Sequence, residues 1–233
     1  PTMRFVKLAA ALAACAVVGA LGTPVAVAQS ACADLGGEVN AEGTCRVHVQ
    51  NRTYTLTMTF PDDYPDQQAL VAYLTQARDG FVNVAENPDA RNLPYELDAR
   101  GTGYRSGPPN GGTRSVVFTM WENVGGVRPQ SYYQAFNWNV AKRAPITFDT
   151  LFKPGAQPMP VLYREVNRYL EHQLGTMNPV SEAAGLDPAN YQHFALTDDE
   201  LIFFFSPGQL LPPSAGPVQA SVPRSAVASM LAV

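Results

Sequence analysis

The sequence predicts an α+β protein in which antiparallel sheet is combined with two separate helices. Several segments alternate apolar and polar residues as strands do, and two others repeat apolar residues at helical spacing. The chain has 233 residues, of which 46% are hydrophobic and 15% charged. That length and composition allow one domain with a substantial core, or at most two small ones, and exclude a disordered, highly charged chain.

The charge balance excludes one class of partner. The formal net charge at pH 7 is -4, from 16 lysines and arginines against 20 aspartates and glutamates. A protein that binds nucleic acid normally gathers positive charge to neutralise phosphates. We therefore expect no nucleic-acid partner.

Residues 1–28 have the pattern of a cleaved export signal. Arg4 and Lys7 precede an almost purely aliphatic run, and an A-x-A cleavage site ends at Ala28. The aliphatic run, Leu8 to Leu21, is shorter than a membrane-spanning helix, which needs about 20 residues. Cleavage is therefore favoured over retention as an anchor. We expect a secreted or envelope-associated product whose mature chain has no transmembrane segment.

Lipidation of Cys15 is a competing interpretation of the same segment. This cysteine ends the lipobox-like sequence Leu12-Ala13-Ala14-Cys15. A lipidated cysteine should follow the apolar region, whereas here the apolar run continues past it. Cleavage after Ala28 is preferred, so that Cys15 leaves with the signal.

Cys32 and Cys45 are the two cysteines of the predicted mature chain. An even pair in an exported protein predicts a disulfide. Zinc binding is the competing use, but the nearest histidine is His48 and no C-x-x-C spacing is present. We predict the disulfide, no metal site and no cofactor.

The first part of the mature chain, residues 29–128, predicts strands around one helix. Alternation from Val47 to Phe60, clearest over Tyr54 to Phe60, indicates a half-buried strand, with a turn at Asn51-Arg52 just before it. Helical spacing from Leu70 to Val84 indicates a helix with an aspartate cap. Shorter strands are expected over residues 95–104 and 114–123, on either side of a loop rich in glycine and proline.

The second part, residues 129–233, predicts hairpins and another helix. Its predicted elements are a long aromatic strand at 131–140, a helix at 161–174, a hairpin of residues 194–196 and 201–205, a strand at 218–222 and a short helix from Pro223. The run Ile202 to Phe205 has no polar break, so we expect it in the centre of a sheet.

Several short motifs match a known family along nearly the whole chain. They are Phe60-Pro61 with Tyr64-Pro65-Asp66-Gln67, Ala135-Phe136-Asn137-Trp138, Pro145 to Leu151, Gly185-Leu186-Asp187-Pro188, Asp199 to Pro217 and Val222 to Ala226. In these motifs the chain resembles the mycobacterial secreted immunogenic proteins, the MPT/MPB culture-filtrate antigen family. From about Pro129 it also resembles an extracellular module, a domain of unknown function, of lysozyme-sensing anti-sigma factors and some peptidoglycan deacetylases.

These resemblances imply a β-grasp-like α+β fold in a single compact domain, which agrees with the pattern of elements. They imply no agreed biochemical role. Members of the family are described mainly as antigens directed at the host, and esterase activity has been attributed within it.

The serine positions give little support to an esterase. The elbow of an α/β-hydrolase needs G-x-S-x-G, and the nearest sequences, around Ser206 and Ser214, each keep only the second glycine. Pro207 follows Ser206 and has no N–H to donate to an oxyanion. Ala215, which follows Ser214, has an N–H that could serve as this donor. Both serines are expected in turns, and both are kept as catalytic candidates.

A serine nucleophile also needs a base, and His193 is the candidate. Asp187 lies close to it in sequence, as do two further aspartates, so a carboxylate could orient its ring. His172 is expected on a helix surface, and His48 near the disulfide. The catalytic candidates are therefore Ser206, Ser214, His193 and Asp187.

Binding is the preferred function. Aromatic residues gather in the strand at 131–140, where Phe136 and Trp138 are expected in the core and Tyr133, Asn137 and Asn139 on the other, exposed face. We predict a secreted or envelope-associated antigen-like protein that binds an extracellular protein or a cell-wall glycan. The alternative is a weak serine carboxylesterase acting on short-chain esters. The sequence carries no prediction of oligomeric state.

Overall fold

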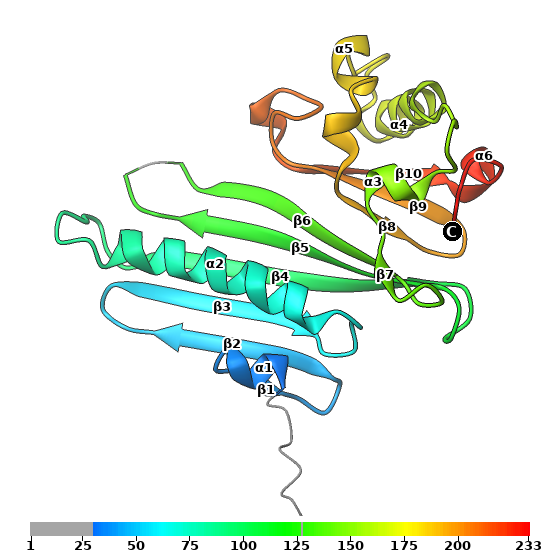
Figure 1. The fold of residues 1–233 in the computed structure, drawn as a ribbon. Helices are drawn as coiled ribbons and strands as arrows, with labels where there is room; N and C mark the ends of the chain where they lie inside the picture. Colours follow the sequence, from blue (N-terminus) through cyan, green and yellow to red (C-terminus); the bar gives the residue numbers. More distant parts are fainter. Residues whose placement is uncertain (1–29, 127) are drawn as a thin grey trace, which may run out of the picture.

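The computed structural model describes residues 30–126 and 128–233. The predicted export signal and Cys15 lie outside the described residues. Two sheets and the helices around them form one compact α+β body (Figure 1). The fold class predicted from the sequence is confirmed.

The larger sheet, as far as the structure describes the chain, has seven strands that follow one another in chain order. They are β1 (Glu38–Val39), β2 (Thr44–Gln50), β3 (Tyr54–Pro61), β4 (Tyr95–Ser106), β5 (Thr113–Asn123), β6 (Gln130–Asn139) and β7 (Ala144–Pro145). All neighbouring pairs are antiparallel except β3 with β4.

The parallel pair corrects the prediction of purely antiparallel sheets. Helix α2 (Gln67–Ala85) carries the chain back along the sheet between β3 and β4, so that the two strands run in the same direction (Figure 1). The side chain of Asp66 accepts a hydrogen bond from the N–H of Ala69 at 3.3 Å, which is the aspartate cap predicted for this helix.

The smaller sheet is antiparallel, with β9 (Glu200–Phe205) between β8 (Phe194–Leu196) and β10 (Val218–Pro223). The helical segments of this half of the described chain are α3 (Phe148–Leu151), α4 (Met159–Leu174), α5 (Glu182–Gly185), the 3-10 turns η1 (Pro188–Tyr191) and η2 (Pro213–Ala215), and α6 (Arg224–Val227). The second predicted helix, the hairpin and the final strand are all present.

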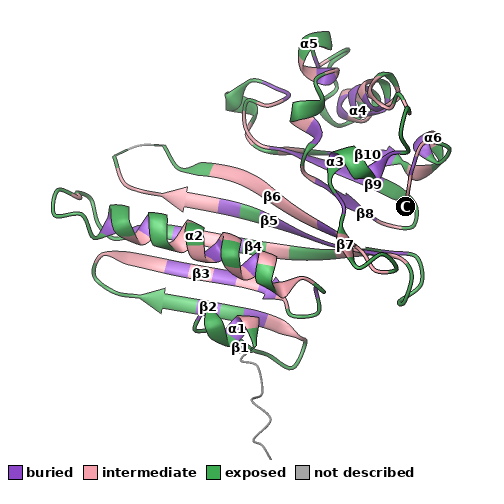
Figure 2. Ribbon diagram, viewed as in Figure 1, coloured by how far each residue is buried: buried purple, intermediate pink, exposed green. Residues whose placement is uncertain are grey.

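The two sheets meet where β5 and β6 of the larger sheet pack against β8 and β9 of the smaller one. On β5, Val116 faces the core beneath α2, whereas Val117 contacts the smaller sheet. On β9, Ile202 and Phe204 contact the larger sheet, and Phe203 faces the core beneath α4. Figure 2 shows the buried residues along these strands. Because both faces of β9 are covered, its apolar run needs no polar alternation, and its predicted central position is confirmed.

The predicted disulfide is present. Cys32 on α1 (Ala31–Asp34) is bonded to Cys45 on β2, with 5.6 Å between their Cα atoms. Both cysteines are buried, so the link fastens the short first helix to the second strand of the larger sheet.

The predicted division between residues 128 and 129 remains a prediction. In the structure this position lies in the connection between β5 and β6, two neighbouring strands of the same sheet. Within the residues that the structure describes, no helix is long and apolar enough to cross a membrane.

Candidate functional site

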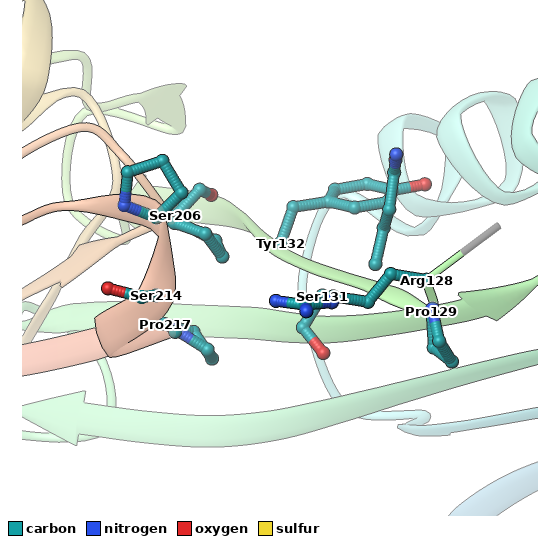
Figure 3. Close-up of a pocket in the computed structure, with 11 residues that line it drawn as sticks. Arg128, Pro129, Ser131, Tyr132, Ser206, Ser214 and Pro217 are labelled. Carbon is teal, nitrogen blue, oxygen red and sulfur yellow. The ribbon is translucent and has the colours of Figure 1, made fainter.

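A pocket of about 610 Å³ lies between the start of β6 and the segment that follows β9 (Figure 3). One wall is formed by Arg128, Pro129, Gln130, Ser131 and Tyr132, and the other by Ser206, Pro207, Pro213, Ser214, Gly216 and Pro217. The fold therefore brings both candidate serines to one pocket. None of these lining residues is a histidine or a carboxylate.

Ser206 directly follows β9, and its hydroxyl oxygen is already a hydrogen-bond acceptor. Its Oγ accepts from the backbone N–H of Tyr133 at 3.0 Å. Its own N–H donates to Oε1 of Gln209 at 2.7 Å, which fixes the turn. Pro207 supplies no N–H for an oxyanion. Ser206 therefore joins the end of β9 to the edge of β6.

Ser214 is exposed in η2 and is no better placed for catalysis. The oxyanion donor expected from the sequence was the N–H of Ala215. That N–H instead donates to the carbonyl of Pro212 at 2.9 Å within the 3-10 turn. The expected donor is therefore occupied, and the prediction that Ala215 leaves one free is corrected.

His193 lies just before β8 and is half-buried. Its Nδ1 lies 3.2 Å from the backbone N–H of Ala135 on β6. Because a backbone N–H can only donate, Nδ1 is the acceptor and the proton of the neutral ring is on Nε2. Burial lowers the pKa of His193, which favours this neutral form. With Nδ1 engaged and Nε2 protonated, the ring has no free lone pair to take a proton from a serine.

Asp187, the candidate partner of His193, has another role. Its Oδ1 accepts from the N–H of Ala189 at 3.0 Å and so caps η1. Asp198, another nearby aspartate, accepts from the N–H of Gly107 at 2.7 Å. In the described chain no hydrogen bond links His193 to either aspartate or to the two serines, so the structure does not assemble the candidate triad.

The predicted exposed binding face is corrected as well. Tyr133 is half-buried and packs edge-on against Phe204, with 5.3 Å between ring centroids. Asn137 is buried, with 5% of its surface exposed. Asn139 accepts from the N–H of Lys142 at 3.0 Å and closes the turn after β6. This face of β6 is covered because the smaller sheet packs on it, an interaction between distant segments that alternation within one strand does not reveal.

Asn137 is a structural link between the two sheets. Its Nδ2 donates to the carbonyl of Phe194 at 2.7 Å, and its Oδ1 accepts from the hydroxyl of Ser115 at 2.6 Å. The same Ser115 oxygen lies 3.4 Å from the N–H of Leu196, which donates to it. Each side chain in this chain of hydrogen bonds has a partner, as buried polar groups require.

One cation, Arg128, lines the pocket. Arg128 is exposed, and no carboxylate within residues 30–126 and 128–233 forms an ion pair with it. Figure 3 shows its side chain extending along the pocket toward Ser214 and Pro217, while Tyr132 points the other way. Burial, and secondarily the charge of Glu122, raise the pKa of Tyr132, so its phenol stays neutral at pH 7. The pocket therefore favours an anionic group.

The arrangement offers hydrogen bonds and one positive charge. Across the part of the chain that is described, no three His, Cys, Asp or Glu side chains gather as metal ligands. Arg128 and Ser131 were not named from the sequence. The proline-rich segment after Ser206 was the one available indication, because such a segment forms an extended surface loop.

Solved structures share this arrangement of two sheets and helices. A DUF3298 family protein from Pseudomonas aeruginosa PAO1 superposes with a TM-score of 0.54 at 12% identity, covering 84% of this chain and 96% of that one. A member from Bacteroides fragilis NCTC 9343 gives 0.52 at 12% identity, covering 82% and 93%. These likenesses define the fold.

The family model "Protein of unknown function (DUF3298)" matches residues 149–225, which contain the smaller sheet. "Esterase Rv3036c" of Mycobacterium tuberculosis is 50% identical over 97% of this chain and 98% of its own length. "Immunogenic protein MPB64" of Mycobacterium bovis and "Immunogenic protein MPT64" of M. tuberculosis are each 42% identical over 91% of this chain and 92% of theirs. The chain belongs to the family of these immunogenic proteins, as its motifs indicated.

Proposed function

We propose that this protein is exported and acts by binding an extracellular protein or a cell-wall glycan in the pocket between β6 and the Pro207–Pro217 segment. One observation carries the proposal. Ser206 and His193 each accept a hydrogen bond from a backbone N–H of β6. The pocket can therefore bind a ligand through hydrogen bonds and charge, but it has no activated nucleophile.

Export is supported by three independent features. Residues 1–28 have the pattern of a cleavable signal, the mature body carries a disulfide, and two relatives are named immunogenic proteins. A disulfide of this kind is typical of proteins that fold outside the reducing cytoplasm.

A weak serine carboxylesterase acting on short-chain esters is the second candidate. It is favoured by the relative named as an esterase, at 50% identity, and by the presence of Ser206 and Ser214 in one pocket. For such an activity the hydrogen bond between His193 and Ala135 would have to break, because only then does Nδ1 become a base.

The two candidates separate in one pair of assays. Residues 29–233, which contain the whole described body, are incubated with p-nitrophenyl acetate and butyrate, beside Ser206→Ala, Ser214→Ala and His193→Ala. Ser225→Ala, an exposed serine on α6, is the matched control. We expect no turnover that depends on these side chains.

The same protein is tested for retention on insoluble peptidoglycan and on immobilised lysozyme, beside Arg128→Gln. Retention that Arg128→Gln weakens supports binding in the pocket. Turnover abolished by Ser206→Ala or Ser214→Ala, and unaffected by Ser225→Ala, would instead establish the esterase.

A further inference from the structure

Strand β6 has a second edge, opposite β5, and the structure covers it by three different means. At one end, the carbonyl of Asn137 accepts from the N–H of Ile146 at 2.8 Å. Next along the strand, Ala135 donates to His193, and Tyr133 donates to Ser206. Alternate residues of this strand therefore direct their backbone groups away from β5.

Ser131 continues this alternation. Its N–H and C=O point to the same side as those of Tyr133, because residues two apart in a strand share an orientation. Ser131 lines the pocket, and within the described chain no side chain or loop donates to, or accepts from, its backbone on that side. Ser206 is thus the last group that covers the β6 edge, and the pocket lies beside the uncovered Ser131.

An uncovered strand edge is a template for another strand, since its N–H and C=O groups need partners. The opposite wall includes Pro213 and Pro217, which have no N–H and so cannot supply the missing donors. These rings leave an apolar surface for side chains. The cavity of about 610 Å³ is within the usual range of binding sites, about 300–1,000 Å³.

Arg128 adds a charge preference to this edge. Its exposed guanidinium extends along the pocket (Figure 3) and has no carboxylate partner in the described residues. A carboxylate would match it by a bidentate hydrogen bond. The ligand complementary to both features has a backbone that can pair in extended form and at least one acidic group.

We propose that the pocket binds an extended acidic peptide segment of a partner protein, which adds as a strand beside Ser131 of β6 and places a carboxylate on Arg128. This assignment rests on the binding function proposed above and selects protein over glycan as the partner. A glycan can bond to Arg128 and to hydroxyl groups, but it has no backbone to pair with a strand edge.

The test begins with a displayed library of random octapeptides. Peptides that bind to immobilised protein of residues 29–233 are selected from it. The selected sequence is synthesised, and its affinity is measured for the wild type, Ser131→Pro, Ser131→Ala and Arg128→Gln. Proline removes only an outward N–H, which edge strands tolerate, whereas alanine keeps that N–H and is the matched control. A peptide N-methylated at alternate residues tests the same pairing on unaltered protein.

We expect acidic sequences to be selected. Ser131→Pro and N-methylation should each weaken binding about tenfold, the effect of one lost hydrogen bond. Ser131→Ala keeps the backbone N–H and should therefore weaken binding less than Ser131→Pro does. Arg128→Gln should weaken binding and reduce its dependence on salt.

Two results would overturn the assignment. Peptide binding that is insensitive to N-methylation would show that no strand pairing occurs. Failure to select any peptide, combined with retention on peptidoglycan that Arg128→Gln weakens, would reject the peptide partner and leave the proposed binding function standing. If neither peptide nor peptidoglycan nor lysozyme is bound, both proposals fail.

Discussion

The ring of His193 accepts a hydrogen bond from the backbone of Ala135, 58 residues earlier in the chain, over 3.2 Å. The bond requires an unprotonated Nδ1, because the imidazolium ion has two donors and no acceptor. It holds the smaller sheet against the edge of the larger one only while the ring is neutral. The residue that looked most like a catalytic base from the sequence is therefore a pH-sensitive structural contact.

The stability of the protein should fall in mild acid because of His193. Burial lowers its pKa in the folded state below the ordinary value of 6.5. At a pH above that ordinary value, His193 is neutral in both the folded and the unfolded chain. At a lower pH the unfolded chain binds a proton at His193 more readily than the folded chain does. The free energy of unfolding therefore decreases as the pH falls. His193→Asn keeps an acceptor and does not titrate.

Urea midpoints of the wild type and His193→Asn at pH 7.5, 6.5 and 5.5 measure this effect. The wild type should lose more stability than the variant below pH 6.5. His172→Asn, an exposed histidine on α4, is the control and should behave as the wild type. Identical pH dependence in the wild type and His193→Asn would refute the assigned role.

Removing the side chain of Asn137 should destabilise the contact between the sheets. Asn137→Ala leaves the carbonyl of Phe194 and the hydroxyl of Ser115 without their partner. The expected loss is about 2–6 kcal/mol, since each of the two buried groups left unpaired costs about 1–3 kcal/mol. Asn139→Ala, in the turn after β6, should cost about 1 kcal/mol or less. Equal effects in urea unfolding would contradict the buried role of Asn137.

The disulfide should account for a substantial share of stability. Cys32 and Cys45 are 13 residues apart, and closing a loop of that size stabilises a fold by about 3 kcal/mol in the chain-entropy model. The double variant Cys32→Ser with Cys45→Ser should show that loss in urea unfolding. Dithiothreitol should shift the wild type to the same midpoint and leave the double variant unchanged. A wild type indifferent to reduction would mean that the bond does not form.

Two glycines should respond to alanine in opposite directions. A Cβ at Gly101 of β4 would lie 2.9 Å from the ring of Phe118 and 2.9 Å from the Cβ of Phe60, so Gly101→Ala should cost about 1–3 kcal/mol through overpacking. A Cβ at Gly80 of α2 meets nothing within 4 Å, so Gly80→Ala should stabilise the helix by about 1 kcal/mol. Thermal unfolding of both variants measures the difference, and a stabilising Gly101→Ala would contradict the packing beneath α2.

Local patterns predicted the elements well because each depends on residues near one another. Asp66 caps α2, and the unbroken run from Ile202 to Phe205 forms the central strand β9. The direction of β4 beside β3 was missed, since it depends on how α2 returns the chain. So was the burial of Asn137, which depends on a sheet formed more than 50 residues later.

The candidate site shows the same division. Ser206 and Ser214 could be named from short motifs, and the structure brings both to one pocket. Their environment could not be predicted, because it is made by contacts such as that of Ser206 with Tyr133. Arg128 could be recognised as a site residue only from the pocket, since a single arginine beside a proline forms no motif.

The reactivity of the two pocket serines tests the central claim most directly. Protein of residues 29–233 is incubated with a fluorophosphonate beside a known serine hydrolase, and the mass of each is measured. We predict that neither Ser206 nor Ser214 gains the label while the hydrolase is fully labelled, because no base activates either hydroxyl. Stoichiometric labelling of one of these serines, abolished by its change to alanine, would contradict the account.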